Sequence, residues 1–140
     1  MGKTISHTTS IRVRYVDTDK MGVVYHGVYL SYFEVARTEM LRAAGIPYSR
    51  LEETGILMPV LEASARYLQP ARYDDVLDLK ATYCTDHGAV MHIDYVITKG
   101  QQVLVTGFTK HTFVNSETWQ PVRPPKHFRE IVQAVAKDNV

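Results

Sequence analysis

The 140-residue chain lacks several features that mark particular classes of protein. Its single cysteine, Cys84, excludes an intrachain disulfide and favours a reducing compartment. It contains no run of about 18 apolar residues and no signal-like apolar stretch near its start, so we expect a cytoplasmic protein without a membrane span. A formal net charge of only +1 argues against a broad surface for nucleic acid.

Motifs of several enzyme classes are missing as well. The sequence has no Gly-rich phosphate loop, no Cys/His metal-binding spacing and no Gly-x-Ser-x-Gly nucleophile elbow. The six histidines are scattered along the chain. A nucleotide hydrolase, a zinc enzyme and a serine hydrolase therefore have no support, and we expect neither a metal nor a resident cofactor.

What is present is the composition of an ordinary globular protein. Hydrophobic residues make up 45% of the chain and charged residues 22%. The length is enough for one substantial core, and no repeat, linker or low-complexity segment divides the sequence. We therefore expect a single domain over residues 1–140.

The first predicted elements are a strand and a long helix. Ile11, Val13 and Tyr15 alternate with arginines, which is the period-two pattern of a strand with one buried face. From about Gly27 to Gly45 the apolar residues follow helical spacing instead. Leu30, Tyr32 and Val35 make its first turns apolar nearly all round, which predicts an enclosed start, whereas Arg37, Glu39 and Arg42 indicate that the later turns reach solvent.

Shorter elements are expected after that helix. They are a short helix at Tyr48–Glu53, four strands at Leu57–Leu68, Val76–Thr85, Ala89–Thr98 and Val103–Val114, and an amphipathic helix between Pro124 and Lys137. Turns at His87-Gly88 and Lys99-Gly100 should join the last three strands into an antiparallel meander. This order predicts an α+β fold in which an antiparallel sheet curls around a central helix.

The loop before the long helix carries the most suggestive chemistry. Asp17 and Asp19 are followed by Gly22, which lets the backbone turn tightly, and then by His26 where helical periodicity begins. The first N–H groups of a helix have no intrahelical partner and lie at its positive end. The segment from His26 to Val28 could therefore hold a developing negative charge, and a carboxylate beside such donors suits hydrolysis.

These residues resemble a known family. Asp17-Thr-Asp-Lys-Met-Gly-Val-Val-Tyr-His26, followed by Tyr29-Leu-Ser-Tyr-Phe-Glu-Val-Ala-Arg-Thr-Glu-Met-Leu-Arg42, is similar to the YbgC branch of the 4-hydroxybenzoyl-CoA thioesterase-like hotdog proteins. The resemblance covers most of the chain, with a weaker echo in residues 69–75. It implies the hotdog fold and hydrolysis of an acyl-CoA or acyl-carrier-protein thioester. It also implies a homodimer or homotetramer, in which subunits pair edge to edge and share active sites.

By the same resemblance Asp19 is the catalytic base or nucleophile. The N–H of His26 would stabilise the oxyanion while its imidazole positions the substrate, and Tyr25 and Gly27 would contact the substrate. Ordinary structural roles are the alternatives: Asp19 as a turn cap, His26 bonded to a carbonyl, and Tyr25 as a core residue. For Asp17 we favour a loop-fixing role.

Other charged residues receive weaker assignments. Glu34 and Glu39 each have an arginine three residues on, so we expect ion pairs rather than catalysis. Coenzyme A phosphates would need cations, for which the candidates are Arg66, Arg72, Lys99, Lys110 and Arg123. Two alternatives to a thioesterase stay open: a non-catalytic acyl-CoA or acyl-carrier-protein binding module, and a hotdog dehydratase.

Overall fold

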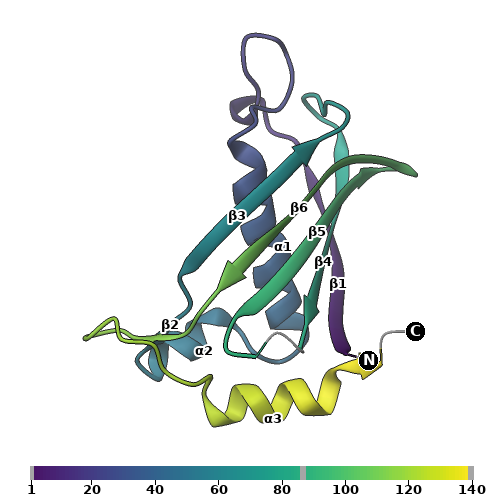
Figure 1. Ribbon diagram of the computed structural model, residues 1–140. Helices are drawn as coiled ribbons and strands as arrows, with labels where there is room; N and C mark the ends of the chain where they lie inside the picture. Colours follow the sequence, from purple (N-terminus) through teal and green to yellow (C-terminus); the bar gives the residue numbers. More distant parts are fainter. Residues whose placement is uncertain (1, 86–87, 139–140) are drawn as a thin grey trace.

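An antiparallel sheet wraps around one long helix in the computed structural model, which describes residues 2–85 and 88–138 (Figure 1). The six-stranded sheet has the order β3-β6-β5-β4-β1-β8. Its strands are β1 (Lys3–Arg12), β3 (Val60–Tyr67), β4 (Val76–Cys84), β5 (Met91–Lys99), β6 (Gln102–His111) and β8 (Lys137–Asp138). The predicted α+β architecture and the β4-β5-β6 meander are confirmed. His87 of the predicted first turn lies outside the described residues.

The helices lie close to where their sequence patterns placed them. They are α1 (Val28–Ala43), α2 (Tyr48–Glu53) and α3 (Lys126–Val135), and a one-turn 3₁₀ helix, η1, spans Tyr15–Asp17. Gly45 follows α1 with φ +88°, a backbone conformation that glycine adopts without strain. No helix in the described part of the chain is long and apolar enough to cross a membrane.

The centre of the core is a contact between α1 and the middle of the sheet. The ring of Phe33 stacks on Tyr95 of β5, with centroids 4.3 Å apart and planes 6° from parallel. Gly107 of β6 lies opposite Tyr95 in the ladder. A Cβ at Gly107 would lie 2.6 Å from the Phe33 ring and 2.3 Å from the Ser64 carbonyl oxygen. The Phe33 ring therefore packs where any other residue at 107 would place its side chain.

The prediction of the first strand was wrong in its position. The strand begins at Lys3 and ends at Arg12, and Tyr15 lies in η1 with 78% of its surface exposed. The chain turns because the N–H of Asp17 donates to the Arg14 carbonyl and that of Thr18 donates to the Tyr15 carbonyl. Most of β1 consists of Thr, Ser and other polar residues, so its apolar alternation is weak.

Two of the predicted strands are interrupted. The Leu57–Leu68 segment divides into β2 (Ile56–Leu57) and β3, because Pro59 has no N–H to donate to a ladder. The Val103–Val114 segment likewise divides into β6 and β7 (Val114–Asn115). Strands β2 and β7 pair with each other in a separate two-stranded sheet.

The predicted enclosure of the first turns of α1 is wrong for the single chain. Leu30 is 45% exposed and Val35 is 39% exposed, because the sheet covers only the opposite side of the helix. The predictions that Arg37 reaches solvent and pairs with Glu34 also need correction. The Arg37 charge instead lies close enough to act on buried Tyr95 and His111, whereas Arg42 forms the expected ion pair with Glu39.

A buried histidine, His111, belongs to a small polar cluster in the core. The Nε2 of His111 lies 2.8 Å from the Thr109 hydroxyl, which in turn lies 2.6 Å from the Tyr95 hydroxyl. Burial, reinforced by the Arg37 charge, lowers the pKa of His111 to about 4. The imidazole is therefore neutral at pH 7 and acts as a hydrogen-bonding core residue.

Asp17 fixes the end of η1 to α1, as a loop-fixing role requires. Its carboxylate accepts hydrogen bonds from the Arg14 N–H (3.0 Å), the Arg14 guanidinium (3.2 Å) and the Tyr32 hydroxyl (2.9 Å). Burial alone would raise the pKa of Asp17, but these hydrogen bonds outweigh it and hold the pKa below its usual value of 3.8. The charged form therefore stabilises the fold.

We predict that Asp17→Asn lowers the free energy of unfolding by about 2 kcal/mol at neutral pH, since a neutral amide accepts these hydrogen bonds less well. Because the folded pKa is depressed, the stabilisation is complete above the usual pKa and is lost as pH falls through the lowered value. Urea unfolding at neutral pH and at about pH 3 should show a gap between wild type and variant that narrows in acid.

The matched control is Asp74→Asn, because Asp74 pairs with Arg12 on an exposed surface. This change should cost less than about 1 kcal/mol. An Asp17→Asn effect that stayed constant down to acid pH would contradict the assignment.

Candidate active site

The loop that carries Asp19 is a tight hairpin. The N–H of Asp19 donates to the Val23 carbonyl at 3.0 Å, and Thr18 pairs with Val24. Gly22 turns the chain with φ +79°, and its N–H donates to the Asp19 carbonyl at 2.9 Å. A side chain at position 22 would strain this left-handed backbone, which explains the glycine in the motif.

The hairpin is held against two other segments. The N–H of Val24 donates to the Ala71 carbonyl at 2.8 Å, and Val23 pairs with Arg72. The N–H of Tyr25 donates to the carbonyl of Asp17 at 2.9 Å. The weaker echo in residues 69–75 is thus the segment on which the Asp19 loop rests.

Asp19 and His26 line the same cavity, which has a volume of about 360 Å³. Its other lining residues come from the loop, from the first turn of α1 and from the end of β3: Met21, Val23, Val24, Tyr29, Tyr67, Leu68, Gln69 and Pro70. Most of these are apolar or aromatic, and the volume is in the range of small-molecule sites. The structure therefore brings together the two residues that the sequence singled out for catalysis.

The Asp19 carboxylate makes one hydrogen bond within the loop. Its Oδ1 accepts from the N–H of Met21 at 2.9 Å, which is the turn-capping contact expected of an ordinary loop aspartate. Its Oδ2 accepts no hydrogen bond from any residue that the structure describes. One oxygen thus orients the side chain while the other is available to a ligand or a water molecule.

Two backbone donors at the start of α1 are also available. The Val28 N–H is not free, because it donates to the Tyr25 carbonyl at 2.9 Å. The predicted anion-binding segment from His26 to Val28 is therefore shorter than expected. Within residues 2–85 and 88–138, the N–H groups of His26 and Gly27 donate to no protein acceptor. They lie at the positive end of a 16-residue helix, where they could bind a partial negative charge.

Aromatic rings surround the His26 turn. The Tyr25 ring lies 4.2 Å from the imidazole of His26, and a Cβ on Gly27 would lie 3.0 Å from the same tyrosine. Tyr25 and Gly27 therefore flank the cavity rather than line it in the single chain. On the other side, the Tyr67 hydroxyl donates to the His26 carbonyl at 3.1 Å.

Sequence reasoning missed Tyr67 and Tyr29. Tyr67 lies 41 residues from His26 in the chain, and the alternation that predicted its strand gives no sign of this contact. Tyr29 was named within the family motif, with no role in the site, whereas it lines the cavity with its ring 5.5 Å from that of Tyr67.

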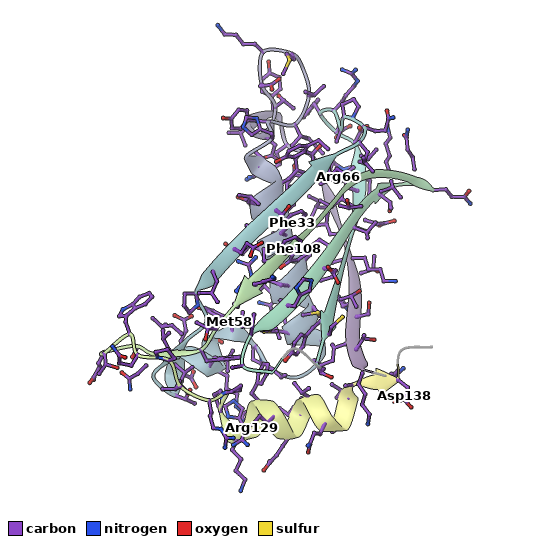
Figure 2. All side chains as sticks on the ribbon, in the orientation of Figure 1. Phe33, Met58, Arg66, Phe108, Arg129 and Asp138 are labelled. Carbon is purple, nitrogen blue, oxygen red and sulfur yellow. The ribbon has the colours of Figure 1, made fainter. Side chains whose placement is uncertain are left out.

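The candidate cations lie in different surroundings. Lys99 pairs with Asp75 at 2.9 Å and Lys110 with Glu62 at 3.7 Å. Arg66 is exposed at the end of the molecule that carries the Asp19 loop, as Figure 2 shows. Arg123 lines a different cavity beside α3. Among the described residues, no three His, Cys, Asp or Glu side chains are grouped to hold a metal ion.

Comparisons with known proteins agree with this geometry. The sequence pattern of the thioesterase-like superfamily matches residues 13–132. The acyl-CoA thioesterase YbgC of Haemophilus influenzae is 32% identical over 120 residues, covering 85% of this chain and 88% of that protein. The acyl-CoA thioester hydrolase YbgC of Escherichia coli is 34% identical over 95 residues, covering 68% of this chain and 71% of that protein.

Solved structures extend the comparison to the fold. A DHNA-CoA thioesterase from Staphylococcus aureus superimposes with a TM-score of 0.87 at 29% identity, covering 93% of this chain and 90% of that one. The expected hotdog fold is thereby confirmed, and a thioester hydrolase is confirmed at the level of the family. Since the family pattern spans most of the chain and relatives of similar length exceed 30% identity, the chain belongs to the thioesterase-like superfamily.

Proposed function

We propose that the chain hydrolyses acyl-CoA thioesters to a free acid and coenzyme A, with Asp19 and the His26 turn as its catalytic centre. The observation that carries this proposal is the cavity shared by Asp19, which has a free carboxylate oxygen, and His26, which has a free N–H; the free N–H of Gly27 lies at the edge of this cavity in the same turn. The relatives named as acyl-CoA thioesterases support the choice of substrate.

The proposed reaction places the thioester carbonyl oxygen at the N–H groups of His26 and Gly27. Asp19 accepts a proton from water as the water oxygen attacks the carbonyl carbon, and the N–H groups stabilise the oxyanion of the tetrahedral intermediate. Collapse of the intermediate breaks the carbon–sulfur bond, and the proton held by Asp19 passes to the departing thiolate. Direct attack by the carboxylate, followed by hydrolysis of the resulting anhydride, would use the same residues.

The alternatives fit the arrangement less well. A dehydratase pairs a loop histidine with a helix acid, but Glu39 is bonded to Arg42 and Glu34 lines a different cavity from His26. A non-catalytic binding module would not need a carboxylate with a free oxygen in its cavity. An acyl-carrier-protein thioester presents the same carbonyl and thiol, so it stays a second substrate class within this proposal. A cytoplasmic location also stays a prediction.

For the coenzyme A phosphates we favour Arg66 and Arg72. Both are exposed, and the backbone of Arg72 pairs with Val23 of the Asp19 loop. Arg66 lies near the end of β3, at the end of the molecule that carries the Asp19 loop (Figure 2). Lys99 and Lys110 are less available because each already has a carboxylate partner.

We further propose that the subunits associate through the free edge of β3. Among the residues that the structure describes, this strand pairs only with β6, and seven of its eight residues are exposed. Unpaired strand edges promote association between chains, and the 59% exposed Leu61 adds apolar surface there. Because β3 ends at Tyr67, a partner on this edge would lie beside the cavity and could complete it.

The first test is Asp19→Asn, assayed on a panel of acyl-CoA substrates with a thiol-trapping dye. Asparagine keeps an oxygen for the Met21 N–H, so the loop should stay folded while kcat falls at least ~10²-fold. Asp17→Asn is the comparison, and it should cost more stability and less activity. Near-normal turnover by a folded Asp19→Asn protein would refute the proposed role.

The second test separates the backbone donors from the imidazole. Gly27 has φ −67°, which suits proline, so Gly27→Pro removes the N–H with little change of backbone. Gly27→Ala is the matched control, because it adds the same Cβ near Tyr25 but keeps the N–H. We expect Gly27→Pro to lose about 10²–10³-fold more kcat than Gly27→Ala.

His26→Ala, which retains its own N–H, should lose about 10-fold, partly in KM if the imidazole positions the substrate. Equal kcat for the two Gly27 variants would show that the Gly27 N–H is not an oxyanion donor.

The third test concerns the β3 edge. Ser64 lies near the middle of β3 and is exposed, so Ser64→Lys should place like charges near each other across a two-fold axis. We expect sedimentation velocity to show a shift towards monomers together with a loss of activity. Gln101→Lys adds the same charge in the exposed β5–β6 turn and should change neither. A fully active Ser64→Lys protein of unchanged mass would rule out β3 as the interface.

A further inference from the structure

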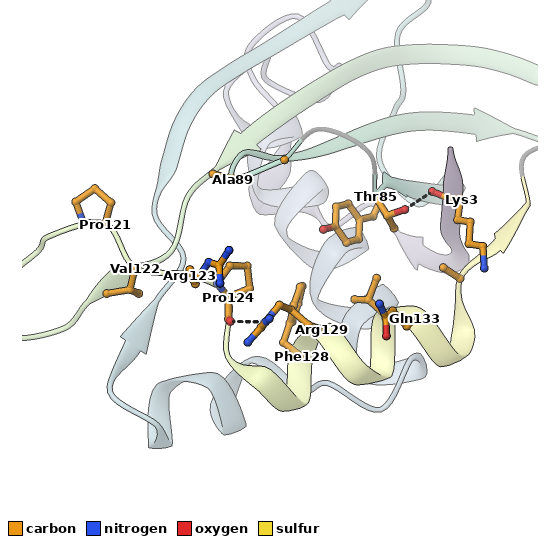
Figure 3. Close-up of a pocket in the computed structure, with 14 residues that line it drawn as sticks. Lys3, Thr85, Ala89, Pro121, Val122, Arg123, Pro124, Phe128, Arg129 and Gln133 are labelled. Atoms are coloured by element: carbon orange, nitrogen blue, oxygen red, sulfur yellow. Dashed lines mark hydrogen bonds between the residues drawn. The ribbon is translucent and has the colours of Figure 1, made fainter. Parts of the chain in front are cut away.

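A second cavity, which we call the distal cavity, lies at the opposite end of the molecule from the Asp19 loop (Figure 1). It has a volume of about 850 Å³ and lies between α3, the ends of β1 and β4, and the segment before α3 (Figure 3). In Figure 1 the Asp19 loop stands above α1, whereas α3 crosses the lower end of the sheet. No residue is shared between this distal cavity and the cavity of Asp19 and His26.

The helix α3 is held most firmly at Phe128, while Val132 and Ala136 are only partly buried against the core. Phe128 is its only buried residue, and the Phe128 ring packs 5.1 Å from Phe113 and 6.4 Å from Tyr83. Beyond Phe128 the apolar side of the helix continues through Val132 to Ala136, at helical spacing. The space between that side and Tyr83 is lined by apolar and aromatic groups without being filled by them.

Positive charge is concentrated at the rim of this space. Lys3, Arg123 and Arg129 line the cavity, and none of its described lining residues is acidic. Within the described chain these three side chains form no ion pair, although the protein as a whole has a net charge of only +1. Arg123 and Arg129 lie at one end of the cavity, and Lys3 lies at the other (Figure 3).

The two arginines are arranged for an anion. The Nε of Arg129 donates to the Pro124 carbonyl at 3.2 Å, which orients the guanidinium beside the residue that follows Arg123. The terminal nitrogens of Arg129 have no acceptor among the described residues. A guanidinium fixed through Nε still presents donors that match two oxygens of a carboxylate or phosphate.

We propose that the distal cavity binds a single-chain amphiphile with an anionic head group, a carboxylate or a phosphate. Arg123 and Arg129 hold the head group, and the aliphatic tail lies along Phe128, Val132 and Ala136. Charge complementarity selects an anionic head, and the elongated apolar wall selects a tail rather than a second polar group. The volume is in the range of cavities that enclose a small molecule.

The test is isothermal titration calorimetry of the full chain with decanoate, decyl phosphate and decanol. These probes share one tail and differ in the head group, so the two anions distinguish a carboxylate from a phosphate site. We expect at least one anion to bind and the neutral alcohol to bind at least about tenfold more weakly.

Arg123→Ala and Arg129→Ala should each raise the Kd of the anion about tenfold or more. Arg123 makes no hydrogen bond within the described chain, so its variant tests the charge even if loss of the Arg129 contact loosens the loop. Arg50→Ala, an exposed arginine on α2, is the control and should leave binding unchanged.

A pair of cavity-filling changes locates the binding. Gln133 lines the distal cavity from an exposed position on α3, and Leu68 is an exposed lining residue of the Asp19 cavity. Gln133→Trp should abolish anion binding, whereas Leu68→Trp should not. The proposal is overturned if neither anion binds at millimolar concentration, if decanol binds equally well, or if Leu68→Trp rather than Gln133→Trp removes binding. A changed oligomeric mass of Gln133→Trp without anion binding would instead identify this face as a subunit interface.

Discussion

The close approach of α1 to the sheet is the constraint on which the rest of the structure depends. Phe33 lies flat on Tyr95 only because position 107 has no side chain, and the ladder places Gly107 between Ala65 of β3 and Tyr95 of β5. A larger residue at 107 would push the helix from the sheet or displace the aromatic ring. This contact therefore sets how closely α1 approaches the middle of the sheet.

The candidate active site is positioned by residues of α1 that neighbour Phe33. With Phe33 fixed, Tyr32 reaches the Asp17 carboxylate on one side of α1 and Tyr29 reaches the cavity on another. Asp17 then holds the segment from which the Asp19 hairpin projects, and Ala71 holds the far side of that hairpin. The loop owes its position to buried contacts, so the free oxygen of Asp19 and the free N–H groups of the His26 turn are preorganised.

The features that depend on residues close together in the sequence were the ones predicted. The approximate bounds of α1, α2 and α3, the β4-β5-β6 meander and the proximity of Asp19 to His26 follow from spacing, turn residues and the motif around Asp19. The position of β1 did not, because its polar residues alternate weakly and its pairing with β4 supplies the order. Tyr67 escaped notice for a similar reason: its contact with His26 joins residues far apart in sequence.

The exposure of Leu30 and Val35 bears on the proposed assembly of subunits. Their spacing predicts a helix start covered on all sides, and the chain alone covers only one side. Leu30 lines a cavity between α1 and the free edge of β3 together with Val60 and Ala63, whereas Val35 lines a different cavity beside the end of β1 and η1. A subunit bound at the β3 edge would lie against Leu30 and remove its apolar surface from water. Some apolar residues of α1 thus pack within the chain, and others would pack against the partner in the proposed assembly.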